Sequence, residues 1–107
     1  MAVDFLKKKG FEILERNYRY GHKEIDIIGK DKNTIVFIEV KTGRSKIFGA
    51  PQEWVTLRKQ KSMIEVAQDY IQKQDFRDYD FRFDVVAISF EKGKREIEHI
   101  KNAFMVA

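Results

Sequence analysis

The sequence predicts one α/β domain over residues 1–107: a mixed sheet flanked by helices, in the order α-β-β-β-α-β with a fifth strand expected at the end. Three observations predict it. A length of 107 residues is typical of one domain. Three strand-like runs separated by short polar turns lie between residues 11 and 41. A helical apolar repeat in residues 52–74 then precedes another strand-like run.

The individual elements follow from local patterns. Five segments have the composition or alternation of strands: 11–20, 23–29, 34–41, 81–90 and 95–100. Residues 2–9 are expected to form a short helix that Gly10 ends in a C-terminal capping position. Residues 52–74 are expected to be helical, and Thr56 can cap the longer part of that segment.

Composition excludes several classes of protein. The absence of cysteine rules out a disulfide scaffold, an iron–sulfur cluster, a cysteine zinc site and a thiol nucleophile. His22 and His99 are the only histidines, which excludes a histidine-rich metal site. No apolar run approaches the ~18 residues of a membrane span, and the N-terminus lacks the apolar core of a signal peptide. We therefore expect a soluble, cytoplasmic protein without a membrane partner.

The positive charge is concentrated in one segment. The chain has a formal net charge of +4, and residues 41–61 contain six basic residues against the single acidic Glu53. The rest of the chain carries 15 basic and 16 acidic residues. A local basic block attracts a phosphate backbone through counterion release. The pattern favours contact with nucleic acid; the alternative is a basic loop without a partner.

Charged residues interrupt two of the expected strands at a spacing of two, which places each pair on one strand face. They are Glu24 and Asp26 in the second strand, and Glu39 and Lys41 in the third. A turn centred on residues 31–32 would set Glu24 opposite Glu39 and Asp26 opposite Phe37. All four charged side chains would then share one face of the sheet, and a slip of one residue would separate Asp26 from Glu39.

Like charges on one sheet face are destabilising unless they are solvated, protonated or neutralised by a cation. An all-oxygen set of ligands favours Mg²⁺ or Mn²⁺ over zinc. The alternative is a solvated strand face whose acids pair with nearby lysine or arginine. Asp84, the lone acid at the centre of its strand, is interpreted as a structural or edge residue.

These residues belong to longer stretches with a common resemblance. The stretches are Gly21–Ile28 (GHKEIDII), Phe37–Thr42 (FIEVKT), Phe48–Glu53 (FGAPQE), Val55–Lys61 (VTLRKQK) and Arg82–Ala87 (RFDVVA). Over residues 5–90 the chain resembles the YraN-like family of small predicted endonucleases. That family is in the restriction-endonuclease-like superfamily, whose pattern is an Asp, a gap and Glu-x-Lys, and which shares its core with archaeal Holliday-junction resolvases.

The resemblance implies a restriction-endonuclease-like fold and a nuclease site. Asp26, Glu39 and the backbone carbonyl of Val40 would bind Mg²⁺ or Mn²⁺. Lys41 would lie beside the attacking water, although a plain salt bridge from Lys41 to Glu39 or Glu24 is the alternative. Glu24 would be an additional ligand or a residue that orients the first ones. Family members usually also carry a Gly-Glu stretch in the first helix, whose position Asp4 does not match.

The basic residues supply candidates for contact with the DNA backbone: Arg44, Lys46, Arg58, Lys59 and Lys61. Three of them cluster where the long helix begins, a position at which cations oppose the helix dipole and phosphate is favoured. Gln60 could orient a phosphate or a water, or could simply be a helix surface residue. Phe48 and Trp54 could stack on a splayed base, but packing in the core or in a dimer is the more common role of such aromatic side chains.

Three functions compete for this sequence. The first is a metal-dependent endonuclease that hydrolyses DNA phosphodiester bonds, with branched or nicked DNA among its candidate substrates. The second is a nucleic-acid-binding module of the same fold with weak or no catalysis. The third is a structural domain with a merely acidic surface. A homodimer would suit a resolvase-type activity, and the apolar stretch 103–107 could close the core or mediate dimerisation.

Overall fold

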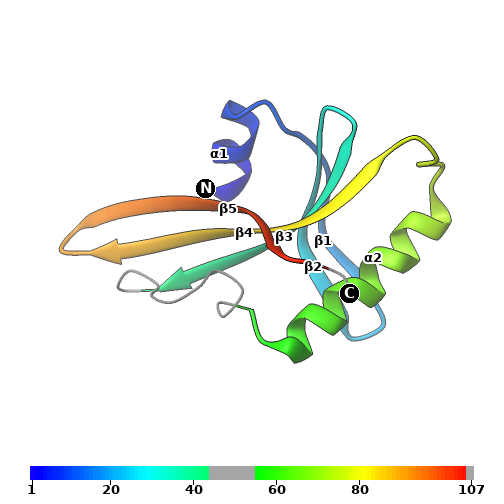
Figure 1. Cartoon of the computed structure of the whole chain (residues 1–107). Coiled ribbons are helices and arrows are strands. Elements are labelled where there is room, and N and C mark those ends of the chain that lie inside the picture. Colours follow the sequence, from blue (N-terminus) through cyan, green and yellow to red (C-terminus); the bar gives the residue numbers. More distant parts are fainter. Residues whose placement is uncertain (44–54, 106–107) are drawn as a thin grey trace.

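A computed structural model of the chain describes residues 1–43 and 55–105 (Figure 1). The described elements follow the chain in this order: α1 (Ala2–Lys8), β1 (Glu12–Tyr20), β2 (Lys23–Asp31), β3 (Thr34–Gly43), α2 (Leu57–Lys73), β4 (Asp80–Glu91) and β5 (Lys94–Phe104). The predicted order and the fifth strand are confirmed. Thr56 is the N-cap of α2, because its side chain accepts a hydrogen bond from the Lys59 N–H.

The five strands form one mixed sheet in the order β1-β2-β3-β4-β5. β3 and β4 are parallel, and every other neighbouring pair is antiparallel. The parallel pair arises because α2 lies between β3 and β4 in the chain, and parallel neighbours need such a crossover. The predicted α/β class with a mixed sheet is confirmed, and the arrangement is compatible with a restriction-endonuclease-like core.

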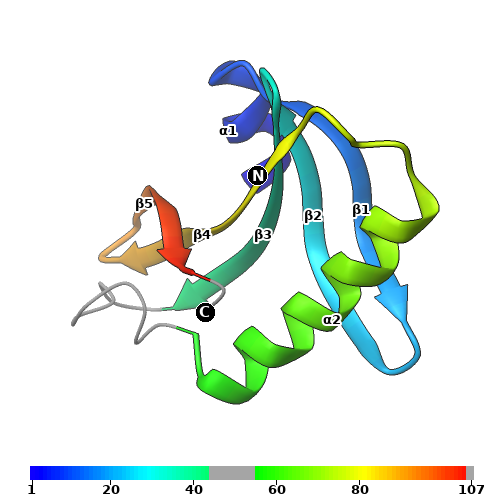
Figure 2. The same ribbon diagram turned by 45° about the vertical axis from the view of Figure 1, so that its right-hand side comes forward.

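The two helices cover opposite faces of the sheet, and alternation in β3 separates the two faces. Ile35 and Phe37 belong to the apolar cluster that includes Met63 of α2, whereas Val36 belongs to the cluster that includes Leu6 of α1. Figure 2 shows α2 lying across β1 and β2, the strands that it contacts. Charged residues at the end of β3 that face the same way as Phe37 are therefore placed near the start of α2.

The register of β2 and β3 differs from the expected one by two residues. Ile28 pairs with Phe37 and Asp31 with Thr34, so the turn is Lys32-Asn33 and not the expected turn centred on residues 31–32. Lys32 adopts the left-handed conformation with φ 56°, which a tight turn requires of one of its residues. The expected pairing of Asp26 with Phe37 is therefore wrong. A shift of two residues nevertheless preserves the strand faces, and it brings Glu39 level with Asp26.

The C-terminal end of β5 closes the core. Ala103 and Phe104 are buried, and the ring of Phe104 stacks on that of Phe83 with centroids 4.8 Å apart. Met105 is exposed, and residues 106–107 lie outside the described part. This apolar stretch was expected either to close the core or to mediate dimerisation, and its residues 103 and 104 close the core.

Asp84 in β4 is fully buried within a hydrogen-bonded network on the α1 side. Its carboxylate accepts from Arg82 Nε at 3.0 Å and from the Asn102 N–H at 3.0 Å, and His99 Nε2 lies 2.7 Å away. Lys9 Nζ lies 2.7 Å from His99 Nδ1; a lysine only donates, so Nε2 carries the hydrogen donated to Asp84. Burial would raise the pKa of Asp84, but these donors outweigh it and hold the pKa below its usual value.

We expect Asp84→Ala to lower the free energy of unfolding by about 3–5 kcal/mol, because it breaks a buried ion pair and leaves Arg82 with only its longer contact to Asp31, at 3.4 Å. Arg82 is only 14% exposed. Asp75→Ala is the matched control, since Asp75 and Arg77 are also two residues apart but form an exposed pair, which should contribute little. Urea unfolding measures both variants. An equal loss of stability in the two would contradict a structural role for the Asp84 network.

Candidate functional site

Two carboxyl groups meet where β2 leaves β3. The strand pairing ends at Ile27 and Ile38. Beyond it, the Val40 N–H donates to Asp26 Oδ2 at 2.8 Å instead of to a strand carbonyl. Glu39 extends from β3 toward the α2 side and is only 7% exposed. The carboxyl group of Asp26 is close enough to that of Glu39 to raise its pKa.

The negative charges of Asp26 and Glu39 are only partly neutralised by the nearby lysines. Burial, together with the hydrogen bond and the negative charge of Asp26, raises the pKa of Glu39 to about 7. The positive charges of Lys59 and Lys41 lower that pKa but do not cancel the rise. Glu39 therefore exchanges its proton near neutral pH, and an added cation would relieve the same repulsion.

Glu24 does not join the two acids, and the expectation of one face for all the charged residues is wrong here. Lys23 forms an ion pair with Glu65 of α2, and Ile25 packs in the core cluster on the α2 side. Alternation then directs Glu24, which lies between them, away from α2. Its carboxylate lies 3.5 Å from Arg19 on the neighbouring strand. A catalytic role for Glu24 stays a prediction.

Lys59 occupies a place that the sequence did not indicate. Its ammonium lies 3.7 Å from Glu39 Oε2 and donates to the backbone carbonyl of Glu24 at 3.3 Å. The sequence placed Lys59 among the contacts to the DNA backbone. The one available signal was its position three residues after the Thr56 cap, which fixes it in the first turn of α2. Only the tertiary structure brings that turn to β2 and β3.

The other predicted residues surround this centre or fall outside it. Lys41 is half-buried on β3 and close enough to lower the pKa of Glu39, and the described residues include no ion pair from Lys41 to either glutamate. Arg58 and Lys61 are exposed in the first two turns of α2. Gln60 is half-buried, and its side-chain amide donates to the Val55 carbonyl at 2.9 Å.

Part of the predicted set lies outside the described residues. It comprises Arg44 and Lys46, predicted to contact DNA, and the aromatic residues Phe48 and Trp54. The segment that contains them connects the end of β3 to the start of α2, the two elements that contribute Glu39 and Lys59. The expected contacts of these four residues remain predictions.

The donor set of the described site suits a hard divalent cation only in part. Within residues 1–43 and 55–105, no group of three or more histidine, cysteine, aspartate or glutamate side chains is arranged to hold a metal ion. Asp26 and Glu39 supply two carboxylates. Protein-bound Mg²⁺ commonly takes one or two carboxylates and completes its octahedral shell with water and substrate phosphate oxygens. The pair therefore fits such an ion, with oxygen donors alone.

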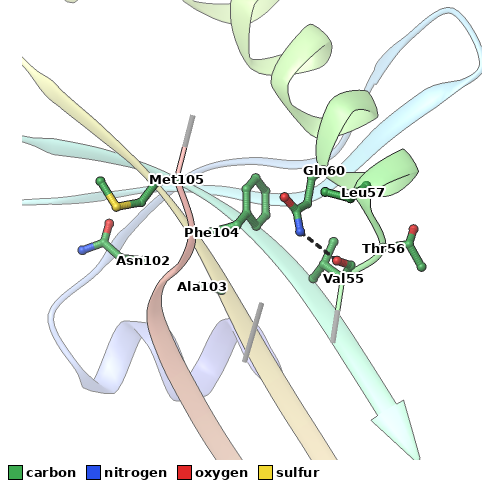
Figure 3. Close-up of a pocket in the computed structure, with 8 residues that line it drawn as sticks. All are labelled: Val55, Thr56, Leu57, Gln60, Asn102, Ala103, Phe104 and Met105. Carbon is green, nitrogen blue, oxygen red and sulfur yellow. Dashed lines mark hydrogen bonds between the residues drawn. The ribbon is translucent and has the colours of Figure 1, made fainter. Parts of the chain in front are cut away.

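A pocket of about 630 Å³ lies beside the start of α2, between the first turn of the helix and the end of β5 (Figure 3). Figure 3 labels Gln60 of α2 and Phe104 of β5 among the residues that line it. Leu57 and Met105, which also line it, are 74% and 82% exposed. Neither Asp26 nor Glu39 lines this pocket, so the largely apolar pocket and the carboxylate pair are separate features of the surface.

The described part of the chain offers no means of crossing a membrane by a helix, because neither α1 nor α2 is long and apolar enough.

The comparisons with known proteins identify the family. The Uncharacterised protein family UPF0102 matches residues 1–88, so the chain belongs to this family. It is 49% identical over 105 residues to a UPF0102 protein of Caldicellulosiruptor saccharolyticus, covering 96% of this chain and 89% of the relative. It is 48% identical over 109 residues to a UPF0102 protein of Clostridium botulinum, with 99% and 89% covered. The expected YraN-like family is thereby confirmed at the level of UPF0102.

Glu39→Gln should stabilise the metal-free protein in mild alkali. With a folded pKa of about 7 and an unfolded value near 4.3, Glu39 binds its proton more tightly when folded. The free energy of unfolding therefore falls as the pH rises from about 4.3 to about 7. We expect Glu39→Gln to be about 1–3 kcal/mol more stable than the wild type at a pH of about 8, with the difference shrinking toward a pH of about 4.

Urea unfolding with a chelator present measures this difference. Glu24→Gln is the control, since Glu24 has a single ion pair with an exposed arginine and should show no comparable gain. A wild type whose stability does not decline relative to Glu39→Gln across this pH range would contradict the raised pKa of Glu39.

Proposed function

We propose that the protein is a metal-dependent endonuclease that hydrolyses DNA phosphodiester bonds, with branched or nicked DNA among its candidate substrates. The observation that carries the proposal is the pairing of Asp26 with the buried Glu39 at the end of β3, next to Lys41 on the same strand. Buried acids with strongly shifted pKa values concentrate at functional sites. The order of the residues agrees with the Asp and Glu-x-Lys pattern that the sequence resembles.

Each residue has a role that its position allows. Asp26 and Glu39 would hold Mg²⁺ or Mn²⁺, with the Val40 carbonyl as a third oxygen implied by the resemblance. Such an ion supplies a Lewis acid for the scissile phosphate and makes a nearby water more acidic. Lys41 would hold the attacking water or a phosphate oxygen. Lys41 is close enough to Glu39 to lower its pKa, so its ammonium would lie near a cation held by that carboxylate.

The start of α2 supports contact with a phosphate backbone. The first turn of this helix contains no acidic residue, and Arg58 and Lys61 are exposed there. Cations at a helix N-terminus oppose the helix dipole, whereas a bound phosphate would reverse the sign of that interaction. Arg44 and Lys46 precede this turn in the chain and extend the same basic segment.

A second candidate is a DNA-binding module of the same fold without catalysis. The described site gathers two acids, whereas three had been expected. Fewer carboxylates make a weaker metal site, which favours this second candidate. The two functions differ in what Asp26 does: a nuclease requires it for cleavage, and a binding module does not.

Cleavage should depend on Mg²⁺ or Mn²⁺ and on the named residues. We expect Asp26→Ala and Lys41→Ala to lower the cleavage rate by about 100-fold or more, because each removes a group that acts on the reacting phosphate. Duplex, single-stranded, nicked and four-way-junction DNA are the substrates to compare on denaturing gels. Equal degradation by the wild type and both variants would identify a contaminant and would contradict the nuclease proposal.

Binding of DNA should weaken with salt through the basic start of α2. We expect Arg58→Ala/Lys61→Ala to reduce the slope of log affinity against log salt by about one for each lost phosphate contact. Fluorescence anisotropy between about 50 and 200 mM salt measures it. The control is Lys7→Ala/Lys8→Ala, which removes two exposed lysines from α1 on the opposite face of the sheet. Equal slopes for both double variants would exclude α2 as the DNA-binding surface.

A further inference from the structure

We infer that Lys59 is an exchangeable occupant of the carboxylate site: its ammonium neutralises Glu39 while no metal is bound, and a divalent cation must displace it. The inference rests on the proposed function, because it takes Asp26 and Glu39 to be the groups that receive the cation. Lys59 then regulates the affinity of the site for metal, in addition to any contact with DNA.

The contacts place the ammonium between the two strands that form the site. It lies 3.7 Å from Glu39 Oε2 on β3 and 3.3 Å from the backbone carbonyl of Glu24 on β2. The Glu39 side chain is only 10% exposed, whereas the Lys59 side chain is 33% exposed. The lysine is therefore the more solvent-accessible member of this ion pair.

A divalent ion and this ammonium cannot share the site without a penalty. A singly charged ammonium and a doubly charged ion about 4 Å apart repel each other even at the dielectric constant of water. This repulsion weakens the binding of the ion by more than about tenfold. The ion must therefore push the ammonium aside or bind more weakly. The two carboxylates attract a divalent ion more strongly than they attract the ammonium, because the ion carries twice the charge and can contact both carboxylates directly.

The lysine can leave without disturbing the helix. The backbone N–H of Lys59 is held by the Thr56 cap at 3.1 Å, and only the four-carbon side chain needs to move. A displaced ammonium would enter solvent near the exposed Arg58, its neighbour in the chain. A phosphate group bound there would accept it. Metal and DNA would then strengthen each other's binding, and the coupling would be reciprocal.

Isothermal titration of the metal-free protein with Mg²⁺, without DNA, tests this inference. We expect Lys59→Met and Lys59→Gln to bind Mg²⁺ about tenfold more tightly than the wild type, because the competing charge is gone. Lys61→Met is the matched control from the same helix and should bind like the wild type. A pH of about 8.5, above the pKa of about 7 of Glu39, keeps protonation from masking the effect. Circular dichroism checks that each variant is folded.

A second readout measures the coupling. Ca²⁺ should raise the affinity of the wild type for a short duplex, and this increase should be smaller in Lys59→Gln. Unchanged or weaker Mg²⁺ binding in both Lys59 variants would overturn the inference and leave the proposed function standing. If neither the wild type nor any variant binds Mg²⁺, the proposed function fails, and the inference fails with it.

Discussion

The early separation of β2 from β3 is the constraint on which the site depends. The ladder stops at Ile27 and Ile38, so the Val40 N–H finds its acceptor in the Asp26 carboxylate. A partly buried backbone donor needs such an acceptor. On the other side of β2, Asn17 has a left-handed φ of 50° and falls between the Arg16–Ile27 and Tyr18–Ile25 pairs. The backbone is thus irregular on both sides of Asp26, and that irregularity lets its side chain reach the end of β3.

Two buried acids on adjacent strands illustrate opposite solutions to the burial of charge. Asp84 on β4 faces the α1 side, where three donors surround it and hold its pKa low. Glu39 on β3 faces the α2 side, where burial and the second carboxyl group, that of Asp26, raise its pKa. The first arrangement is complete without a ligand and stabilises the fold. In the second arrangement too little positive charge surrounds the acids, and such an arrangement lowers the stability of the fold.

The sequence was insufficient for the register of β2 and β3, in which Asp26 was expected opposite Phe37. It was sufficient for the elements and for placing Asp26 and Glu39 on one face of the sheet. Local periodicity determines both, since a register error of two residues leaves the faces of the strands unchanged. It was insufficient for Glu24, because Ile25 and Ile28 pack in the same cluster although they are three residues apart. Strict alternation is therefore lost within β2. The twist of a long hairpin depends on its packing, which no pattern along one strand reveals.

The sequence also could not show that Lys59 contacts Glu39, because the two residues are brought together only by the tertiary structure. This contact makes the environment of Lys59 different from that of the other cations at the start of α2. Three cations near a helix N-terminus are unfavourable as a group. The structure compensates one of them, Lys59, with the carboxylate of Glu39 on the neighbouring strand. Arg58 and Lys61 remain exposed on the same turns. The helix dipole and these two side chains then attract the same kind of ligand, an anion that approaches from solvent. The start of α2 therefore holds one cation that the sheet compensates, whereas the charges of Arg58 and Lys61 are left to the solvent.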